Sequence, residues 1–362
     1  FLFASVLALL CGSSTLHAQD FKLTSSGYFK NQGVDVMAFD DIYPEGHQGG
    51  VCIIMNGHRV ATNGDIRLEA TPGQWQPVPK QLDRKLGDNS ITATLCYPDS
   101  SRHLTGFNPM IYPDLHLIYT VNVESKGKNI EVTVDLDRPI PQEFIGKVGF
   151  NLEFFPGSLF GKPWIMDGQS GIFPQQPNSP LMTTQPNYLH TGNYHDGKKS
   201  LADMNKLIGK GYSPIVADDI ISEPYAKGTK FTSRPDDPYN KVTIESLSGD
   251  LQLFDGRMNH NNGWFVLRSN IKPGVTKGAV KWIITPNVVA DWMYQPVIQT
   301  SQIGYHPTQD KEAVIEMDIR DNRKETAQII RIDADGEKVV KNVTPANWGK
   351  FLRYNYLKVN FT

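Results

Sequence analysis

The amino-acid sequence predicts an all-β protein. Glycine and proline are frequent, with 31 and 24 copies in 362 residues, and aromatic residues make up 10% of the chain. Segments of β-branched and aromatic residues recur, and most of them are bounded by Gly, Pro, Asn or Asp. Such a pattern is typical of many short strands joined by tight turns rather than of long helices.

Length and net charge narrow the function classes. At roughly 100–200 residues per domain the chain has room for two or three domains, each able to bury a core. The formal net charge is -2, so no basic field would recruit a phosphate backbone or anionic lipid. After the first residues no apolar stretch approaches ~20 residues. We therefore expect no nucleic-acid partner and no membrane span in the mature protein.

Residues 1–18 are predicted to be an export signal. The apolar run over residues 1–10 is too short to span a bilayer, and Ala18 precedes the polar Gln19-Asp20 at a position suited to cleavage. Neither an initiating Met nor a basic segment precedes Phe1, so we expect the signal to be truncated at its start. The expected location is periplasmic, outer-surface or extracellular. Lipidation at Cys11 is the alternative to cleavage after Ala18.

Two cysteines remain after this cleavage. Cys52 and Cys96 lie in the strand-like segments 51–54 and 94–97. An oxidising compartment would permit a disulfide between them. In the alternative interpretation both are buried thiols that act as small apolar residues, and the sequence leaves the two possibilities open.

Residues 19–296 are predicted to form a large antiparallel β-sandwich. The predicted strands cover 51–55, 91–97, 115–123, 130–136, 148–155, 242–247, 264–269 and 279–285. Segments 119–123 and 130–134 are expected to pair as a hairpin across 124–129, with polar residues on the water face. This alternation indicates a sheet that is packed on one side.

One long connection interrupts the predicted strands. Residues 156–194 are rich in Pro, Gly and Asn and show little periodicity, and this stretch is long for a structureless connection. Such loops are usually functional or decorate one edge of a sheet. A short helix is predicted over 200–208, where apolar residues fall on one face and Gly209 ends the pattern.

Aromatic residues in and near this connection are the candidate ligand contacts. Flat rings pack against the apolar faces of sugar rings, while neighbouring Asn and Asp side chains bond the hydroxyls. We therefore select Trp164, Tyr188, Tyr194 and Trp264 as candidate carbohydrate-binding residues. The alternative for these tryptophans is packing in the core or between domains.

The sequence indicates neither a metal nor a cofactor. His190, His195 and Asp196 form a cluster, but a metal site needs a further convergent ligand, so we predict none. The segment 333–336 is expected to be a hairpin turn, because the Glu at the twelfth position of a calcium loop is absent. No Ser nucleophile elbow, phosphate loop or dinucleotide fingerprint occurs. We therefore expect no catalytic residue in this chain.

A second domain is predicted after a boundary near Pro296. Its predicted strands, 313–317, 327–332 and 338–340, have the spacing of an immunoglobulin-like sandwich. Residues 297–362 fall short of the ~100 residues of a complete domain of that kind. The sequence also stops within a predicted strand at 358–362. We therefore expect this immunoglobulin-like domain to be truncated.

The start of this second domain resembles a known family. Residues 302–307 read Gln-Ile-Gly-Tyr-His-Pro and precede the strand-like segment 311–315. This stretch is similar to the opening of the immunoglobulin-like domain that precedes the catalytic barrel in glycoside hydrolase family 9 cellulases. Residues 352–356 fit a later strand of that domain. The preceding stretch, 19–295, resembles the large β-sandwich extension that some gut-type bacterial members carry ahead of it.

The resemblance implies an activity for a longer parent protein. Family 9 enzymes hydrolyse β-1,4-glucan or a related glycan with inversion, by a carboxylic acid and a carboxylate base held apart to admit water. These groups belong to a helical barrel that would begin after Thr362. The implied role of this chain is that of an inactive scaffold in a secreted, cellulase-like hydrolase. Its expected partners are β-glucan or a related plant polysaccharide and its own downstream catalytic domain. The alternative is a glycan-binding module of an envelope protein without a hydrolase of its own.

Overall fold

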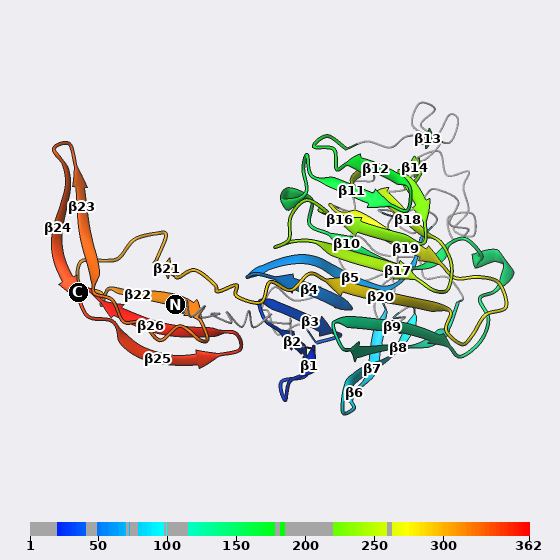
Figure 1. Ribbon diagram of the computed structural model, residues 1–362, viewed down its shortest axis with the longest axis horizontal. Coiled ribbons are helices and arrows are strands. Elements are labelled where there is room, and N and C mark those ends of the chain that lie inside the picture. The colour runs from blue at the N-terminus through cyan, green and yellow to red at the C-terminus, as the bar shows by residue number, and fades with distance from the viewer. Residues whose placement is uncertain are drawn as a thin grey trace, which may run out of the picture. The chain divides into compact units, whose positions relative to one another are not determined.

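The computed structural model describes residues 20–40, 49–69, 72, 79–97, 99, 115–177, 182–184, 220–258 and 263–362. The chain divides into two compact units, with the boundary between Ala290 and Asp291. The described residues form β-strands and short 3-10 turns but no α-helix (Figure 1). The predicted all-β class is therefore confirmed. No helix in the described ranges is long and apolar enough to cross a membrane.

The first unit consists mainly of two nine-stranded antiparallel sheets (Figure 1). In spatial order, the first sheet contains β1 (Lys22–Leu23), β2 (Phe29–Asn31), β3 (Val34–Ala38), β4 (Val51–Met55), β5 (His58–Leu68), β10 (Val148–Phe154), β19 (Phe265–Asn270), β18 (Leu251–Asp255) and β15 (Ala226–Gly228). The second sheet contains β12 (Gln169–Ile172), β11 (Pro163–Met166), β16 (Lys230–Ser233), β17 (Val242–Ser246), β20 (Val280–Pro286), β9 (Asn129–Leu136), β8 (Leu117–Lys126), β7 (Ser90–Tyr97) and β6 (Lys80–Leu86). A separate pair joins β13 (Met182–Thr184) to β14 (Ile220–Ser222), and the 3-10 turns are η2 (Gln142–Phe144), η3 (Pro156–Ser158) and η4 (Gly256–Met258).

The two large sheets pack face to face around one apolar core. Phe150 of β10 meets the ring of Trp282 of β20 edge-on, with centroids 5.0 Å apart. Further along β10, Phe154 meets Phe231 of β16 at 5.8 Å. Edge-to-face pairs of this kind are favourable because the positive ring edge faces the negative ring face. The large β-sandwich predicted from the sequence is thus present in the first unit.

Strands with alternating patterns lie where the sequence predicts them. β7 and β9 alternate strictly between buried and half-buried residues, as expected for a sheet with one face on the core. The predicted hairpin forms between β8 and β9, with Tyr119 opposite Leu136 and Lys126 opposite Asn129. Its turn is shorter than predicted, because Gly127 adopts a φ of 66° and closes the connection within two residues.

The region 156–194 is more regular than the sequence suggests. It contains η3 and the paired strands β11 and β12, which extend the second sheet beside β16. Residues 163–172 thus decorate one edge of the second sheet, which is one of the two roles expected for this region. Its Pro and Gly residues lie at the turns and the sheet edge, where they do not interrupt the ladder. The predicted signal, 1–18, and the predicted helix, 200–208, lie outside the described residues.

The second unit contains two smaller antiparallel sheets. The four-stranded sheet has the order β21 (Val297–Gln299), β22 (Glu312–Asp318), β26 (Tyr354–Asn360) and β25 (Ala346–Phe351), and the two-stranded sheet pairs β23 (Ala327–Asp333) with β24 (Gly336–Val343). The segment 333–336 is a hairpin turn as predicted, with Asp333 opposite Gly336. One face of the larger sheet buries Ala313, Met317, Leu357 and Val359.

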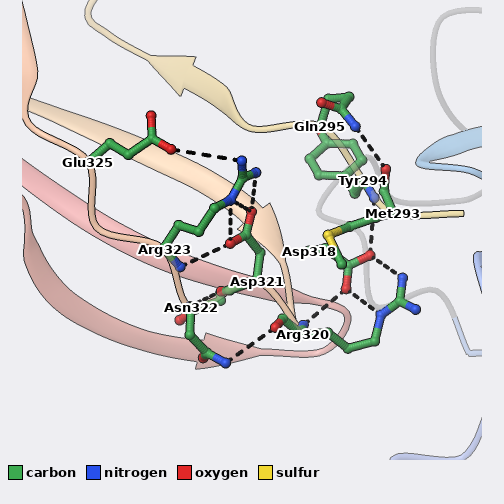
Figure 2. A network of polar contacts seen from close by, with 10 residues as sticks. Met293, Tyr294, Gln295, Asp318, Arg320, Asp321, Asn322, Arg323 and Glu325 are labelled. Atoms are coloured by element: carbon green, nitrogen blue, oxygen red, sulfur yellow. Dashed lines mark hydrogen bonds and ion pairs between the residues drawn. The ribbon is translucent and has the colours of Figure 1, made fainter. Parts of the chain in front are cut away.

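Two Asp-x-Arg pairs organise the end of β22 in the second unit (Figure 2). Asp318 accepts hydrogen bonds from the backbone N and Nε of Arg320, and Asp321 accepts the same two from Arg323. Asp318 also accepts a bond of 3.1 Å from the backbone N of Tyr294, in the segment that precedes β21. Burial alone would raise the pKa of Asp318, but the bonds from Arg320 and Tyr294 lower it to about 2. The network therefore anchors the start of the second unit to its central strand.

Candidate functional site

Trp164, the first of the candidate carbohydrate-binding residues, lies inside the first unit. It sits on β11 opposite Gly171 of β12, and its side chain is 6% exposed. A Cβ at position 171 would lie 2.5 Å from the indole Cζ2, so the absence of a side chain there lets the ring lie flat against the neighbouring strand. The indole Nε1 finds no hydrogen-bond partner among the described residues. Trp164 therefore packs in the core, which is the alternative role that the sequence left open for it.

The other three candidates do not assemble with Trp164 in the structure. Trp264 is half-buried before β19 and meets the ring of Phe155 edge-on, with centroids 4.5 Å apart. It therefore adjoins β19 of the first sheet, whereas Trp164 lies on β11 of the second. Tyr188 and Tyr194 lie outside the described residues, as do His190 and His195.

The cysteines are present as thiols and not as a disulfide. Cys52 is buried on β4 of the first sheet, and Cys96 is half-buried on β7 of the second. Of the two possibilities that the sequence left open, the structure contains the one without a bridge.

A charged cluster is buried between the central strands of the first sheet. Its side chains come from β5, from the residue after it, and from β10 and β19: Asp65, Arg67, Glu69, Asn151, Glu153 and Arg268. We call this set the buried polar cluster. All seven residues of β10 are buried, so both of its faces are covered. Its polar members, Asn151 and Glu153, therefore need hydrogen-bond partners inside the protein.

Arg268 is the centre of the buried polar cluster. Its Nη1 lies 3.3 Å from Glu69 Oε1 and donates to Asn151 Oδ1 at 3.1 Å. Its Nη2 donates to the backbone oxygens of Glu69 and Lys147 at 3.0 and 3.1 Å, and its Nε donates to Asn270 Oδ1 at 2.7 Å. All three guanidinium nitrogens are thus hydrogen-bonded. These bonds offset the cost of removing the charge from water, because the side chain is only 1% exposed.

Space for this guanidinium depends on a glycine. Gly149 of β10 lies beside Arg268, and a Cβ there would come 2.7 Å from Arg268 Nε and 2.8 Å from the backbone oxygen of Ser269. Neither contact is sterically allowed, and the backbone atom has no room to move. The sequence therefore places the arginine and the glycine on neighbouring strands as one packing unit.

Burial shifts the acids of the cluster toward their protonated forms. It raises the pKa of Glu69 to about 7, against the lowering effect of Arg268. It likewise raises the pKa of Asp65 to about 6, against the effects of Arg67 and of the Tyr119 hydroxyl that donates to Asp65 at 2.8 Å. The cluster holds three carboxyl groups against two guanidinium groups, so binding one proton balances its charge.

The cluster suits a structural role better than a catalytic one. The Glu69 side chain is 1% exposed, so a substrate cannot reach its carboxyl group without movement of the fold. Among the described residues no group of three or more His, Cys, Asp or Glu is arranged to hold a metal ion. Because burial raises the pKa of Glu69 to about 7, this carboxyl group is the one expected to change its protonation near neutral pH.

An exposed groove lies on the second unit. It has a volume of about 430 Å³ and is lined by Trp348, Gly349, Lys350, Phe351 and Tyr356. We call it the aromatic groove. Trp348 and Phe351 are 58% and 61% exposed, which is unusual for rings of this size. Trp348 occupies a register shift between β25 and β26, and such bulges redirect a side chain.

The sequence-based selection missed the aromatic groove. Its rings come from β25 and β26, and they meet only through the pairing of these strands. The available signal was the Trp348-Gly349-Lys350 run, in which a large ring is flanked by a turn-forming residue and a charge. Lysine is almost never fully buried unless it is paired, so Lys350 was the residue that indicated a solvent-facing strand.

No protein-family model matches the chain, and no curated protein matches it. One similar solved structure is a galactose mutarotase-like protein from Lactobacillus casei ATCC 334, with a TM-score of 0.33 and 10% identity over 71% of this chain and 98% of that chain. Another is the Slr1438 protein from Synechocystis sp. PCC 6803, with a TM-score of 0.32 and 9% identity over 74% of this chain and 96% of that one. Likeness at this level carries no conclusion about activity.

Proposed function

We propose that this chain is the non-catalytic N-terminal portion of a secreted, polysaccharide-degrading glycoside hydrolase similar to the family 9 cellulases. The observation that carries the proposal is the segment 302–307, which resembles the opening of the immunoglobulin-like domain in that family. In the second unit this segment lies between β21 and β22, at the start of a separate all-β body. Its scaffolding role would be to present a downstream catalytic domain.

The geometry of this segment gives its residues a defined task. Gly304 adopts a φ of 82°, and the Ser301 hydroxyl donates to its backbone oxygen at 2.8 Å, which closes a tight turn. The Tyr305 ring meets Phe361 edge-on at 5.3 Å, and its hydroxyl donates to the backbone oxygen of Glu312. The segment thus joins the beginning and the end of the second unit.

The test compares this chain with the longer product of the same gene. We expect the chain alone to release no reducing sugar from carboxymethyl cellulose or xyloglucan, and the longer product to release it from at least one of them. Hydrolysis by the chain alone would contradict the non-catalytic assignment. A stop codon soon after Thr362 would remove the hydrolase and leave the glycan-binding module as the function.

A further inference from the structure

We propose that the aromatic groove of the second unit binds an uncharged polysaccharide chain, such as a neutral β-glucan. This inference goes beyond the proposed function because it gives the second unit a ligand of its own. The proposed carbohydrate contacts differ from those selected from the sequence, because the ring of Trp164 is buried.

The rings of the groove are held in place before any ligand arrives. The Trp348 ring meets Tyr356 edge-on, with centroids 5.9 Å apart, and the Lys358 ammonium lies 4.8 Å from its centroid on one face. Tyr356 is in turn packed against Tyr354, and Tyr354 against Tyr294, at 5.9 and 5.1 Å. A row of mutually fixed rings loses little conformational freedom on binding, which favours affinity.

Two ammonium groups lie beside the groove. Lys358 Nζ lies 3.3 Å from Glu312 Oε2, and Lys350 Nζ donates to the backbone oxygen of Ile319 at 2.9 Å. Glu312 offsets the charge of Lys358, whereas Lys350 keeps its charge because a backbone carbonyl is neutral. A single ammonium group beside the rings is not the cluster of cations that attracts a phosphate or uronate polymer. An uncharged ligand with apolar faces matches this mainly aromatic lining.

Polar groups for sugar hydroxyls lie next to the rings. β25 is the edge strand of its sheet, so one row of its backbone N–H and C=O groups has no strand partner. All six of its residues are exposed. A glycan needs this combination of a flat apolar surface and adjacent donors and acceptors, because each sugar ring has C–H faces and hydroxyl edges.

The test is affinity electrophoresis of the whole chain in native gels that contain xyloglucan or hydroxyethyl cellulose. We expect migration of the wild-type chain to be retarded by at least one of these neutral polymers. Trp348→Ala removes a ring that is 58% exposed, so we expect about a tenfold or greater increase in the dissociation constant with the fold intact. The matched control is Ile332→Ala, which truncates a side chain that is 76% exposed on β23 and should leave retardation unchanged.

Several outcomes would overturn the proposal. One is a wild-type chain that neither neutral polymer retards, and another is equal retardation of the Trp348→Ala variant. Retardation only in gels with carboxymethyl cellulose or DNA would mean an anionic partner. Size-exclusion chromatography that shows a wild-type dimer and a Trp348→Ala monomer would mean that a second copy covers the groove. Retention is measured separately from sugar release, so failure here leaves the hydrolase proposal standing.

Discussion

At the scale of single residues, the buried polar cluster shows how the first sheet tolerates charge in its interior. Glu69 and Arg268 are both 1% exposed, and each is bonded to the other and to Asn151. Removing one partner of such a pair leaves an uncompensated buried charge, which typically costs about 3–5 kcal/mol. These contacts therefore hold β5, β10 and β19 in one register.

We predict that the first unit loses stability as the pH rises from about 4.5 to 7. The pKa of Glu69 is raised from 4.5 to about 7 in the folded chain, so the folded state binds the proton more tightly than the unfolded state. This contribution is fully present below pH 4.5 and disappears as the pH passes 7. At 1.36 kcal/mol per pKa unit, the free energy of unfolding falls by on the order of 3 kcal/mol. Urea denaturation at several pH values measures it.

The variant Glu69→Gln is the control for this pH dependence. Glutamine keeps an oxygen that can accept from Arg268, but it does not titrate. The variant should therefore keep only the dependence that comes from Asp65, whose raised pKa acts in the same direction. Identical pH profiles for the wild type and Glu69→Gln would show that this carboxyl group is not the titrating one.

A second prediction concerns the close approach at Gly149. In Gly149→Ala the new methyl group would collide with Arg268 Nε and with the backbone of Ser269. We expect a loss of about 2–4 kcal/mol in the free energy of unfolding, because the guanidinium must leave its bonded position. Thermal denaturation measures the loss. In the control Gly157→Ala the methyl group meets no atom within 4 Å and should change stability by less than ~0.5 kcal/mol.

At the scale of strands, alternation was the signal that sequence could use. β7, β8, β9 and β20 were predictable because each alternates between residues that face the core and residues that face water. The edge strand β6 was not, since its residues are mostly polar and exposed. β5 was missed for another reason, because its Asn63-Gly64 pair is typical of a hairpin turn. In the structure Asn63 has a φ of 55° and the strand continues through a bulge.

The candidate sites were less predictable than the strands that carry them. Arg268 and Glu69 are 199 positions apart, and a charged residue in a strand is ordinarily a sign of a water-facing side chain. Trp164 has the ring that a sugar contact needs, but its neighbour Gly171 lets it pack inward. Whether such a side chain is buried depends on which strands pair, and the amino-acid composition does not show which strands pair.

The bulge in β25 carries a third prediction. Gly349 adopts a φ of 145°, a conformation that residues with a Cβ rarely take, although open space surrounds it. Gly349→Ala should therefore change the backbone at the bulge and turn Trp348 away from Tyr356. We expect weaker retardation on neutral glucans and a loss of about 1–3 kcal/mol in stability. Affinity electrophoresis and thermal denaturation measure both. Unchanged retardation would show that the bulge does not orient the ring.

At the scale of the whole molecule, the two units depend on different contacts. The first unit has an extensive apolar core between two sheets, whereas the second has a small core and the Asp-x-Arg network of Figure 2. A unit of about 70 residues buries a smaller fraction of its surface than a large one and is correspondingly less stable. The bonds of Asp318 should therefore matter more to the second unit than any one surface contact matters to the first.

The last prediction is that the two units respond to pH with opposite signs. The lowered pKa of Asp318, about 2, means that its stabilising contribution is present above pH 3.8 and disappears as the pH falls toward 2. Glu69 acts in the other direction between pH 4.5 and 7. Calorimetry should therefore resolve two unfolding transitions. Acidification from pH 7 to 4.5 should raise the transition temperature of the first unit, and further acidification should lower the transition temperature of the second.

The variant Asp318→Asn should destabilise only the second unit. Its free energy of unfolding should fall by about 1–2 kcal/mol, because the three hydrogen bonds that Arg320 donates to this side chain lose their charged acceptor. Asp335→Asn, in the exposed β23–β24 turn, should shift neither transition. One transition that moves as a whole with every variant would show that the units unfold together.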